Sequence, residues 1–504
     1  MNSTSQRKAV VVGAGPVGCL AALALAKRGW LVDIYEGRPD MRLPSSKAVT
    51  QQRSINLAIS SRGILALQAV NPLAAQRFMQ AVIPMHGRMI HHLSGKLESQ
   101  QYDKDGQCIN SIDRALFNES LLDEVSAVPG VRLLFEHKVV HLDFDKKTLS
   151  AQNLPAGQEV EATFDFCIGA DGSYSIVRRQ MMRVVRMNYE QEYIKDEYKE
   201  LKMPAGRNEY GETTFLIDPN HLHIWPRHSF MLIALPNKDK TFTCTLFAPS
   251  TEFERLKTPE SILAWFRSNF PDALGFIGEE TLIKDFQRNP RSPLICTKLR
   301  PYHYKDRAIL LGDAAHSMVP FYGQGLNCGL EDVRVLDALF HEFGVESTVT
   351  SDKPHSTDAV DERLQSVLEF YSENRHEDLV AICDLALNNY AEMRHSVVTP
   401  TYIIKKTLDT LLFSLTSRQT ASLASLGPAL SRTPFPPGMP SGWLPLYTMV
   451  SFRPDISYAT ARRKAARQSR ILANVVSLGT ALLSVATAYL AWSVWVRRTA
   501  IGGS

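Results

Sequence analysis

The 504-residue sequence has few cysteines and little excess charge of either sign. Its seven cysteines are odd in number and scattered, and none forms a C-x-x-C pair. This pattern argues against a disulfide framework or a zinc site, and it favours a reduced, intracellular compartment. The formal net charge of +4 is too small to predict nucleic-acid binding.

Internal repeats are also absent, and we expect no secretory signal peptide, because the N-terminus passes from polar residues directly into an apolar run. The composition is 44% hydrophobic and 21% charged, so the chain can bury a large core. A chain of this length is expected to form about two to four domains.

Long uncharged runs are missing until the C-terminus, where residues 471–496 carry no charge. As a helix this stretch would be about 39 Å long, and a hydrocarbon core is about 30 Å thick. Arginines and lysines flank it on both sides, with more of them before it, and Trp492 and Trp495 lie near one end. These features predict a transmembrane helix that leaves the rest of the chain on the cytosolic side. The alternative is a buried core helix.

The N-terminal stretch has the order strand, glycine-rich turn, helix, strand and acid. An apolar strand over Lys8–Val12 leads into Gly13-Ala14-Gly15-Pro16-Val17-Gly18, followed by a helix from Val17 to Arg28. A second strand from Trp30 to Tyr35 ends at Glu36. This G-x-G-x-x-G pattern in its proper context predicts a dinucleotide site.

Each residue of that motif has a physical role. Gly13 makes the tight turn, Gly15 lets the backbone approach a pyrophosphate, and Gly18 permits close packing of helix on strand. Glu36 can accept hydrogen bonds from ribose hydroxyls. An acid at this position favours FAD or NAD over NADP, because it would repel a 2′-phosphate.

Two further strands end in small or acidic residues. One run ends before Asp171-Gly172, and another, Ala308 to Leu311, ends before Gly312-Asp313. Residues 320–327 then feed a helix from Leu326 to Phe340, whose start after Gly325 offers free N–H groups to an anion. Asp313 can accept hydrogen bonds from a sugar-like chain. Each stretch alone is equally consistent with an ordinary strand, turn and helix.

Between these loops the pattern changes to short alternating runs. Residues 213–247 contain three such runs separated by turn residues, and they predict an antiparallel meander. His221 and His223 alternate on one strand, but no third ligand is apparent, so no metal site is predicted. Arg88 and Tyr102 are placed to lie on adjacent strands, and Arg114 at a helix start suggests a nearby anion.

The C-terminal third is mainly helical. A helix is predicted over Glu362–Arg394, with Asn389 and Met393 on one face, and more helix to about Leu426. A proline-rich loop then leads to residues 446–450.

The three glycine- and aspartate-bearing loops together resemble those of the single-component FAD monooxygenases of the aromatic-hydroxylase type. Longer stretches resemble the kynurenine 3-monooxygenase family more specifically. These stretches are residues 88–91, Tyr102, 222–227, 242–247, 320–327, 389–394 and 445–450. The resemblance covers most of residues 8–460 and includes the C-terminal hydrophobic tail.

The resemblance implies an α/β fold: a Rossmann-type FAD-binding domain with an inserted antiparallel-sheet substrate domain, a C-terminal helical region and a C-terminal transmembrane helix. The implied division is 1–185 with 285–345, 186–284, 346–465 and 471–496. It further implies hydroxylation of L-kynurenine to 3-hydroxy-L-kynurenine with NADPH as a transient cosubstrate and O₂, on the route to quinolinate and NAD. The implied location is the mitochondrial outer membrane, with the catalytic domain facing the cytosol.

The resemblance also implies residue roles. Added to the motif residues Gly13, Gly15, Gly18, Asp171 and Gly325, the implied FAD contacts are Val17, Tyr35, Glu36, Gly37, Arg38, Ala58, Arg114, Val139, Asp313, Leu326 and Asn327. The implied substrate contacts are Arg88, Tyr102, Asn389 and Tyr447. Phe321 and Gln324 would line the pocket near the flavin ring. No acid or base is assigned, because the aniline nitrogen of kynurenine already activates its ring.

The sequence departs from the family pattern at three places. Leu326 replaces a frequent Met, Tyr322 replaces a frequent Phe, and residues between 413 and 440 look inserted, so the match at Tyr447 spans a gap. Two other functions stay open. One is a related FAD monooxygenase acting on another aromatic or lipid substrate. Arg88 and Asn389 argue against a lipid, because they favour a substrate that carries a carboxylate. The other is a non-catalytic, membrane-anchored protein of the same fold.

Overall fold

A six-stranded sheet in the order β21-β22-β13-β2-β3-β9 forms the centre of the N-terminal part of the molecule. All its neighbouring strands are parallel except β21, which runs antiparallel to β22. The strands are β2 (Lys8–Val12), β3 (Leu31–Tyr35), β9 (Val131–Leu134), β13 (Phe166–Gly169), β21 (His303–Tyr304) and β22 (Ala308–Leu310). Their runs of Val, Ile and Ala suit a sheet that is covered on both faces.

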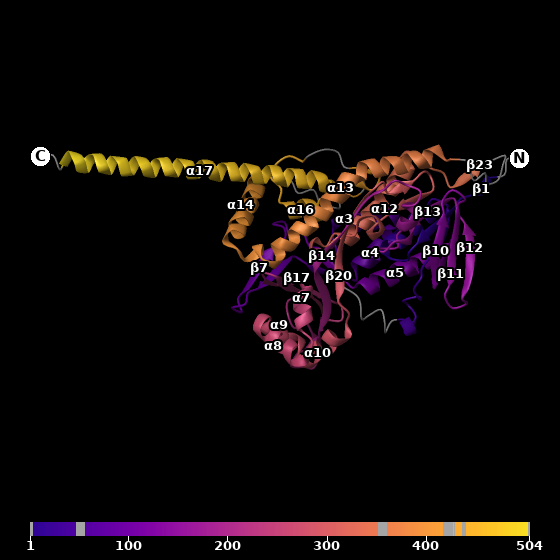
Figure 1. Ribbon diagram of the computed structural model, residues 1–504, viewed down its shortest axis with the longest axis horizontal. Coiled ribbons are helices and arrows are strands. Elements are labelled where there is room, and N and C mark those ends of the chain that lie inside the picture. Colours follow the sequence, from indigo (N-terminus) through magenta and orange to yellow (C-terminus); the bar gives the residue numbers. More distant parts are fainter. Residues whose placement is uncertain are drawn as a thin grey trace.

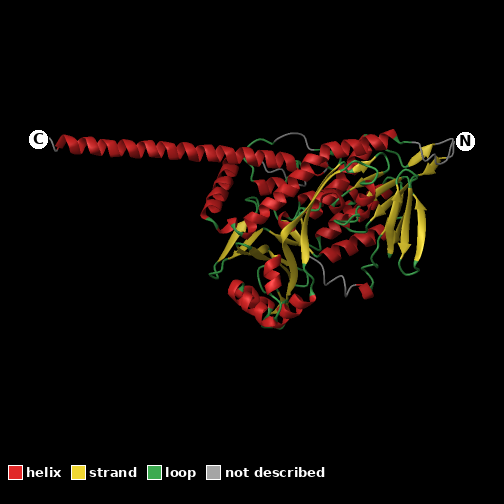
Figure 2. Ribbon diagram, viewed as in Figure 1, coloured by secondary structure: helices red, strands yellow, loops and turns green. Residues whose placement is uncertain are grey.

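The computed structural model describes residues 4–46, 56–350, 360–416, 427, 429–435 and 440–501. Helices pack against the parallel sheet and against one another, and Figure 2 shows them in red around its strands. They are α1 (Pro16–Lys27), α3 (Ser61–Val70), α4 (Pro72–Met79), α5 (Arg114–Ser126), α6 (Ile176–Met181), α11 (Asp313–His316), the 3₁₀ turn η1 (Pro320–Tyr322) and α12 (Gly325–Glu342). Pro16 begins α1, where its missing N–H costs nothing.

Four smaller sheets accompany the large ones in the described part of the chain. One has the order β10-β11-β12 and lies at the N-terminal end of the view in Figure 1. Another has the order β4-β8-β5, and two are two-stranded. Their strands are β1 (Thr4–Gln6), β4 (Leu57–Ile59), β5 (Ile83–Met85), β8 (Ile109–Ile112), β10 (His137–Asp143), β11 (Thr148–Asn153), β12 (Gln158–Thr163), β15 (Gly206–Arg207), β16 (Thr213–Thr214) and β23 (Thr348–Thr350).

A seven-stranded sheet in the order β20-β14-β19-β18-β17-β6-β7 forms the second layer. It contains the predicted antiparallel meander as β17, β18 and β19. Its strands are β6 (Gly87–His91), β7 (Leu97–Gln101), β14 (Asn188–Met203), β17 (His221–Arg227), β18 (Phe230–Pro236), β19 (Phe242–Pro249) and β20 (Ser292–Arg300). The strands β6, β7 and β20 all lie outside residues 186–284, so the sheet combines strands from that range with strands from before and after it.

Four short helices pack on the end of this sheet, at the bottom of the view in Figure 1: α7 (Ser250–Arg255), α8 (Pro259–Asn269), α9 (Pro271–Ile277) and α10 (Glu279–Arg288). The C-terminal region is helical, as predicted. Its elements are α13 (Glu362–Arg394), η2 (Ser396–Val398), α14 (Pro400–Thr416), α16 (Leu446–Ser451) and α17 (Tyr458–Ile501). The start of α17 packs on α13 and α16, and its far end extends well beyond the rest of the molecule in Figure 1.

The prediction of a transmembrane helix over residues 471–496 is wrong. In the described part of the chain, none of the helices combines the length and the apolar character that crossing a membrane requires. The stretch contains no charged residue, but the polar residues Asn474, Ser477 and Thr487 lie within it. The predicted attachment of the chain to a membrane through this helix therefore has no support.

One strand was not expected from the sequence, and one expected helix is described only in part. The unexpected strand is β4, which precedes α3. The helix expected to reach Leu426 is described only as α14, and the rest of that range lies outside the described residues.

Candidate active site

The glycine-rich loop between β2 and α1 leaves space for a ligand in one direction only. Gly13 has a φ of +102°, and a Cβ there would lie 2.5 Å from Ala170 O. At Gly18 a Cβ would lie 2.0 Å from Gly13 O, so both positions are closed by backbone. At Gly15 a Cβ would meet nothing within 4 Å. This open space lies at the N-terminus of α1, where backbone N–H groups favour a phosphate.

Glu36 lies at the end of β3 beside this loop. Its carboxylate accepts hydrogen bonds from Ala14 N (3.0 Å) and Arg38 N (2.9 Å) and pairs with the Arg38 side chain. Burial alone would raise the pKa of Glu36, but the hydrogen bonds and charge of Arg38 outweigh it, and the pKa lies below its usual range. Glu36 is therefore an ionised acceptor at the place where a ribose would lie.

Asn118 on α5 is a residue that the sequence reasoning missed. Its Nδ2 donates to Ala14 O (3.2 Å), and its buried Oδ1 has no hydrogen-bond partner within the described ranges. A buried acceptor without a donor is costly unless a ligand supplies the donor. Asn118 lies one turn after Arg114, which is exposed, so the two lie on the same face of α5. The only available signal was this i, i+4 spacing.

The predicted FAD residues on β3, β10 and the following turn lie together. Tyr35 and Val139 are buried, and a Cβ on Gly37 would contact Lys138 at 3.6 Å. Asp171 is committed elsewhere, because its carboxylate accepts from Ser175 Oγ (2.5 Å) and Ile176 N (2.6 Å) at the start of α6.

Gly312 ends the last parallel strand with a φ of +59° and brings Asp313 to the start of α11. A Cβ on Gly312 would lie 3.1 Å from Val17 Cγ2, so the third loop packs directly on α1. Asp313 is exposed, which leaves its carboxylate accessible to a ligand. The carboxyl ends of β2, β3 and β22 therefore meet around one space, as expected for a parallel sheet.

Asn327 joins the loop before α12 to strand β4. Its Oδ1 accepts from Ser60 N (2.8 Å), and its Nδ2 donates to Ala58 O (2.8 Å) and Gly323 O (2.6 Å). All these groups are used within the protein. Asn327 therefore sets the shape of the loop that includes Leu326, and it brings Ala58 against that loop.

A buried charge network supports the same loop from behind. Asp332 accepts from His316 Nε2 (2.5 Å), Gly312 N (3.2 Å) and Arg375 Nε (3.1 Å). His316, Cys328 and Asp332 place possible metal-ligand atoms within 4.8 Å of one another. Because Arg375 already neutralises Asp332, this group is better explained as an ion-pair network than as a cation site.

A cavity of about 880 Å³ lies between the seven-stranded sheet and the C-terminal helices. All four predicted substrate residues line it: Arg88 from β6, Tyr102 after β7, Asn389 from α13 and Tyr447 from α16. Tyr322, which departs from the family pattern, also lines it. The structure thus brings together residues from four distant parts of the chain.

Arg88 is the buried cation of this cavity. Its Nη1 donates to Glu392 Oε1 (3.1 Å), while its buried Nε has no partner among the residues described. The guanidinium lies 5.8 Å from the ring of Tyr102 and 5.3 Å from that of Tyr447. Burial raises the pKa of both tyrosines above the ordinary value, so they are neutral hydrogen-bonding groups. The arrangement can bind a carboxylate.

Aromatic rings form the wall between this cavity and the loop before α12. Tyr102 stacks on Tyr447 at 4.6 Å, and Tyr447 stacks on Tyr322 at 5.6 Å. Phe321 stacks on Tyr390 at 3.9 Å. Asn389 Nδ2 donates to Phe321 O (2.7 Å), so the substrate helix and the loop are directly joined.

Several polar residues that line the cavity were not predicted, among them Glu392, Tyr402 and Lys406. Glu392 lies on the Asn389 face of α13, a spacing that could have indicated it. Tyr402 and Lys406 come from α14, and Tyr402 donates to Glu392. Burial, together with the charge of Arg88, lowers the pKa of Lys406 to about 8. Nothing local in the sequence identified α14 as a wall of the cavity.

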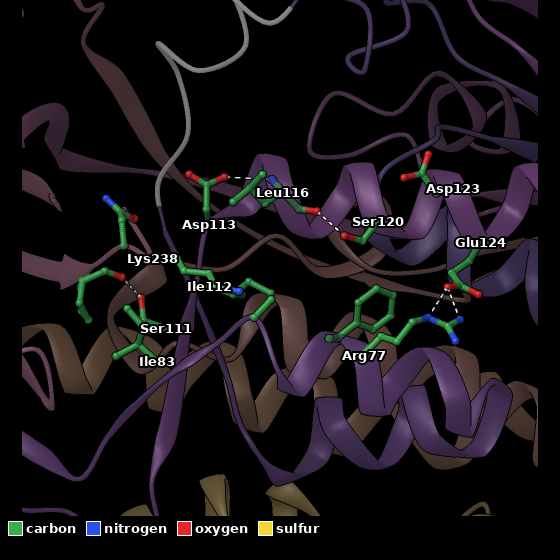
Figure 3. Close-up of a pocket in the computed structure, with 14 residues that line it drawn as sticks. Arg77, Ile83, Ser111, Ile112, Asp113, Leu116, Ser120, Asp123, Glu124 and Lys238 are labelled. Carbon is green, nitrogen blue, oxygen red and sulfur yellow. Dashed lines mark hydrogen bonds and ion pairs between the residues drawn. The ribbon is translucent and has the colours of Figure 1, made fainter. Parts of the chain in front are cut away.

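A smaller cavity of about 250 Å³ lies between α4, α5 and the turn after β18 (Figure 3). Its polar groups serve local structure. Asp113 caps α5 through Leu116 N (3.0 Å), Ser111 Oγ donates to Pro236 O (2.9 Å), and Arg77 pairs with Glu124. The larger cavity is the better site, because it contains a buried cation with an unused donor.

Residues 6–343 match the family model described as an FAD binding domain. The chain is 44% identical over 519 residues to a kynurenine 3-monooxygenase of Cryptococcus neoformans, covering 98% of this chain and 99% of that protein. It is 45% identical over 487 residues to that of Candida albicans, covering 96% of each. The chain belongs to the kynurenine 3-monooxygenase family.

This membership confirms the resemblance seen in the sequence, and the protein is an FAD-dependent monooxygenase. Its fold also resembles a solved 2-methyl-3-hydroxypyridine-5-carboxylic acid oxygenase, with a TM-score of 0.58 and 20% identity over 83% of this chain and 99% of that one. The p-nitrophenol 4-monooxygenase PnpA of Pseudomonas putida gives a TM-score of 0.58 and 18% identity over 84% of this chain and 96% of that one.

For a member of the kynurenine 3-monooxygenase family, the residues present fit FAD. The open space at Gly15, the ionised Glu36 and the unpaired acceptor of Asn118 suit a pyrophosphate and donor-bearing sugar and adenine groups. FAD supplies the two-electron chemistry that activates O₂. The rest of the site has to hold and shield a substrate.

Proposed function

We propose that this enzyme hydroxylates L-kynurenine to 3-hydroxy-L-kynurenine, with FAD bound and NADPH as the electron donor. The balanced reaction consumes kynurenine, NADPH, a proton and O₂, and yields 3-hydroxykynurenine, NADP⁺ and water. The observation that carries the proposal is Arg88, a buried guanidinium with an unused Nε in a cavity that opens beside the loop before α12. The names of the curated relatives support the same substrate.

The polar end of the cavity fits the amino-acid group of kynurenine. Arg88 can bind the carboxylate through two N–H groups, with Tyr102 and Tyr447 as neutral neighbours. Glu392 accepts from Arg88 and Tyr402 through Oε1, and because its side chain is 37% exposed its carboxylate can also pair with the α-ammonium group. The two charges of the substrate therefore meet opposite charges at the same end.

The aromatic wall fits the ring. Tyr322 and Tyr447 present parallel rings beside Asn389, and Phe321 lies behind them against Tyr390. Such surfaces orient an aniline ring and exclude water, which is what hydroxylation of an activated ring requires of a protein. No side chain has to act as a nucleophile.

NADPH is proposed as a transient electron donor and not as a resident cofactor. No second G-x-G-x-x-G motif is present in the sequence, so a resident nicotinamide cofactor is not expected. NADPH would therefore reduce FAD in a transient complex. Comparing the initial rates of FAD reduction with NADPH and NADH under anaerobic conditions would test this choice.

The decisive experiment measures NADPH oxidation by the purified full chain, with and without L-kynurenine, and records the product mass. Kynurenine-stimulated oxidation with a product one oxygen heavier supports the proposal. A yellow, FAD-containing protein whose NADPH oxidation does not respond to kynurenine would agree with the fold but would rule out kynurenine as the substrate. Other aromatic amino acids and a lipid epoxidation substrate are the comparisons, because the main alternative is a related monooxygenase.

A further inference from the structure

Tyr458, the first residue of α17, reaches the loop before α12 from the far end of the chain. Its side chain is fully buried, and its hydroxyl donates to Gln324 Oε1 at 3.1 Å. Gln324 is itself 2% exposed and directly precedes α12. The pair is separated by 134 residues, so this contact exists only because the start of α17 packs onto the body of the enzyme.

In the structure, the contact holds the amide of Gln324 with its Oε1 toward Tyr458. An amide has one accepting end and one donating end. With Tyr458 donating to Oε1, the Nε2 group is the end that remains for another partner. Gln324 lies between Phe321, which contacts Asn389 of the substrate helix, and Asn327, which holds the loop to β4. In a flipped amide, Oε1 instead of Nε2 would face away from Tyr458 at the centre of the loop.

Tyr458 keeps its hydroxyl proton and its ring position. Burial raises the pKa of its hydroxyl well above the ordinary value, while Arg62 opposes that shift in part. The guanidinium of Arg62 lies 4.1 Å from the ring centroid, and that of Arg375 lies 5.8 Å away. Two cations on the ring keep it in one orientation without using its hydroxyl.

The backbone around Tyr458 is fixed by side chains of α13 and α3. Ala459 N donates to Asp378 Oδ1 on α13 (2.8 Å). Arg62 on α3 is 1% exposed, donates to Val450 O (2.7 Å) and to Ile456 O, and pairs with Glu331 on α12 (2.9 Å). These contacts join α16 and the start of α17 to the helices that form the nucleotide side. The position of Tyr458 is therefore fixed by contacts from α13 on one side and from Arg62 of α3 on the other.

We propose that Tyr458 is a positioning residue for the active-site loop, acting through the amide of Gln324. The start of α17 is then part of the catalytic architecture, although most of α17 lies outside the body of the enzyme. This inference rests on the proposed hydroxylase function. It assigns Tyr458 no chemistry of its own, since its hydroxyl acts only on Gln324.

The test replaces the hydroxyl alone. Tyr458→Phe keeps the ring between the two guanidinium groups and removes only the hydrogen bond. The matched control is Tyr371→Phe, because Tyr371 is also fully buried and its hydroxyl has no partner in the described part of the chain. Both variants are made in the full chain, purified with FAD and compared for thermal stability first.

Three readouts separate positioning from simple folding. The first is the dissociation constant for FAD, from the change in flavin fluorescence. The second is the change in the flavin absorption spectrum when kynurenine is added. The third is the share of consumed NADPH that appears as hydrogen peroxide, the product when O₂ is reduced without substrate hydroxylation. Tyr458→Phe should raise the peroxide share by about fivefold, the effect of one ordinary hydrogen bond, and alter the spectral change.

A double variant locates the effect. In a Gln324→Leu background, Tyr458→Phe should produce no further change, because its partner is already absent. Additive effects would place the action of the hydroxyl elsewhere and overturn the proposal, as would a Tyr458→Phe enzyme identical to the Tyr371→Phe control. If the unaltered enzyme does not hydroxylate kynurenine, the proposed function fails instead, and the FAD affinity and FAD spectrum still test the Tyr458 contact.

Discussion

Arg88 and Glu392 form an ion pair inside the large cavity, with 3.1 Å between Arg88 Nη1 and Glu392 Oε1. The Arg88 side chain is 6% exposed, whereas that of Glu392 is 37% exposed. Arg88 is therefore never a buried charge without a partner, even before substrate binds. A substrate carboxylate can join the guanidinium at its unused Nε without first breaking this pair.

Replacing Arg88 with Lys should weaken kynurenine binding and leave FAD binding intact. Lysine keeps the charge but loses the planar fork that holds a carboxylate through two parallel hydrogen bonds. We expect the KM for kynurenine to rise about tenfold, which corresponds to the loss of one charge-assisted hydrogen bond. Steady-state kinetics and an FAD titration measure the two effects. An unchanged KM would place the carboxylate elsewhere.

Lys406 should make substrate binding depend on pH above neutrality. Its pKa is lowered to about 8 by burial and by the charge of Arg88, so it becomes neutral as the pH rises through that value. The cavity then loses one positive charge, and the KM for kynurenine should rise by about fivefold between pH 7 and pH 9. The measurement is the KM at half-unit intervals of pH.

Two substitutions separate this effect from titration of the substrate itself. Lys406→Arg stays charged throughout and should lack the rise contributed by the lysine. Lys406→Met should have a raised KM at every pH. Identical pH profiles for the unaltered enzyme and for Lys406→Arg would show that Lys406 does not act on the substrate.

Gly15 and Gly18 should respond in opposite ways to substitution by alanine. A Cβ on Gly15 meets nothing within 4 Å, so Gly15→Ala should fold normally. It should still weaken FAD binding by more than about tenfold, because the methyl group occupies the approach to the pyrophosphate. A Cβ on Gly18 would lie 2.0 Å from Gly13 O, so Gly18→Ala should destabilise the apoprotein. Thermal unfolding and FAD titration distinguish the two, and normal FAD affinity in Gly15→Ala would contradict the assignment.

The sequence predicted well those parts of the fold that are encoded locally. The strand at Lys8–Val12 and the helix at Glu362–Arg394 occur at the expected bounds, because period, caps and breakers lie within the segment itself. Strand β4 was missed, since its three residues are too few to show a period. The membrane helix was predicted wrongly, because none of the helices in the described part of the chain meets the length and apolar character of a membrane span.

Contacts between distant segments were the least predictable part of the site. Glu392 follows from the helix face that carries Asn389, but Lys406 and Tyr458 have no local signal. Their roles depend on how α14 and α17 pack, which is decided by buried charges such as Arg62. Asp171 shows the opposite case. Its place in a motif suggested a contact with the cofactor, but in the structure its carboxylate accepts from Ile176 N at the start of α6.

His223 should make the stability of the enzyme fall at mildly acidic pH. It was considered from the sequence as a metal ligand, but its ring nitrogens lie 2.8 Å from His91 Nε2 and 2.7 Å from Asp218 O. Burial lowers its pKa to about 4, and the neighbouring His91 adds to that effect, although the hydrogen bond to Asp218 opposes it. Unfolding restores an ordinary histidine, which binds a proton near pH 6.5.

The sign of the effect follows from these two values. Between pH 6.5 and pH 4 the unfolded chain binds a proton at His223 that the folded chain does not, so stability falls as the pH falls. From pH 7 to pH 5 this residue should remove about 2 kcal/mol from the free energy of unfolding. His223→Gln should lose that part of the slope, and the exposed His141→Gln should keep it. Urea unfolding at both pH values measures the difference, and equal slopes in all three proteins would mean that the proton is bound equally in both states.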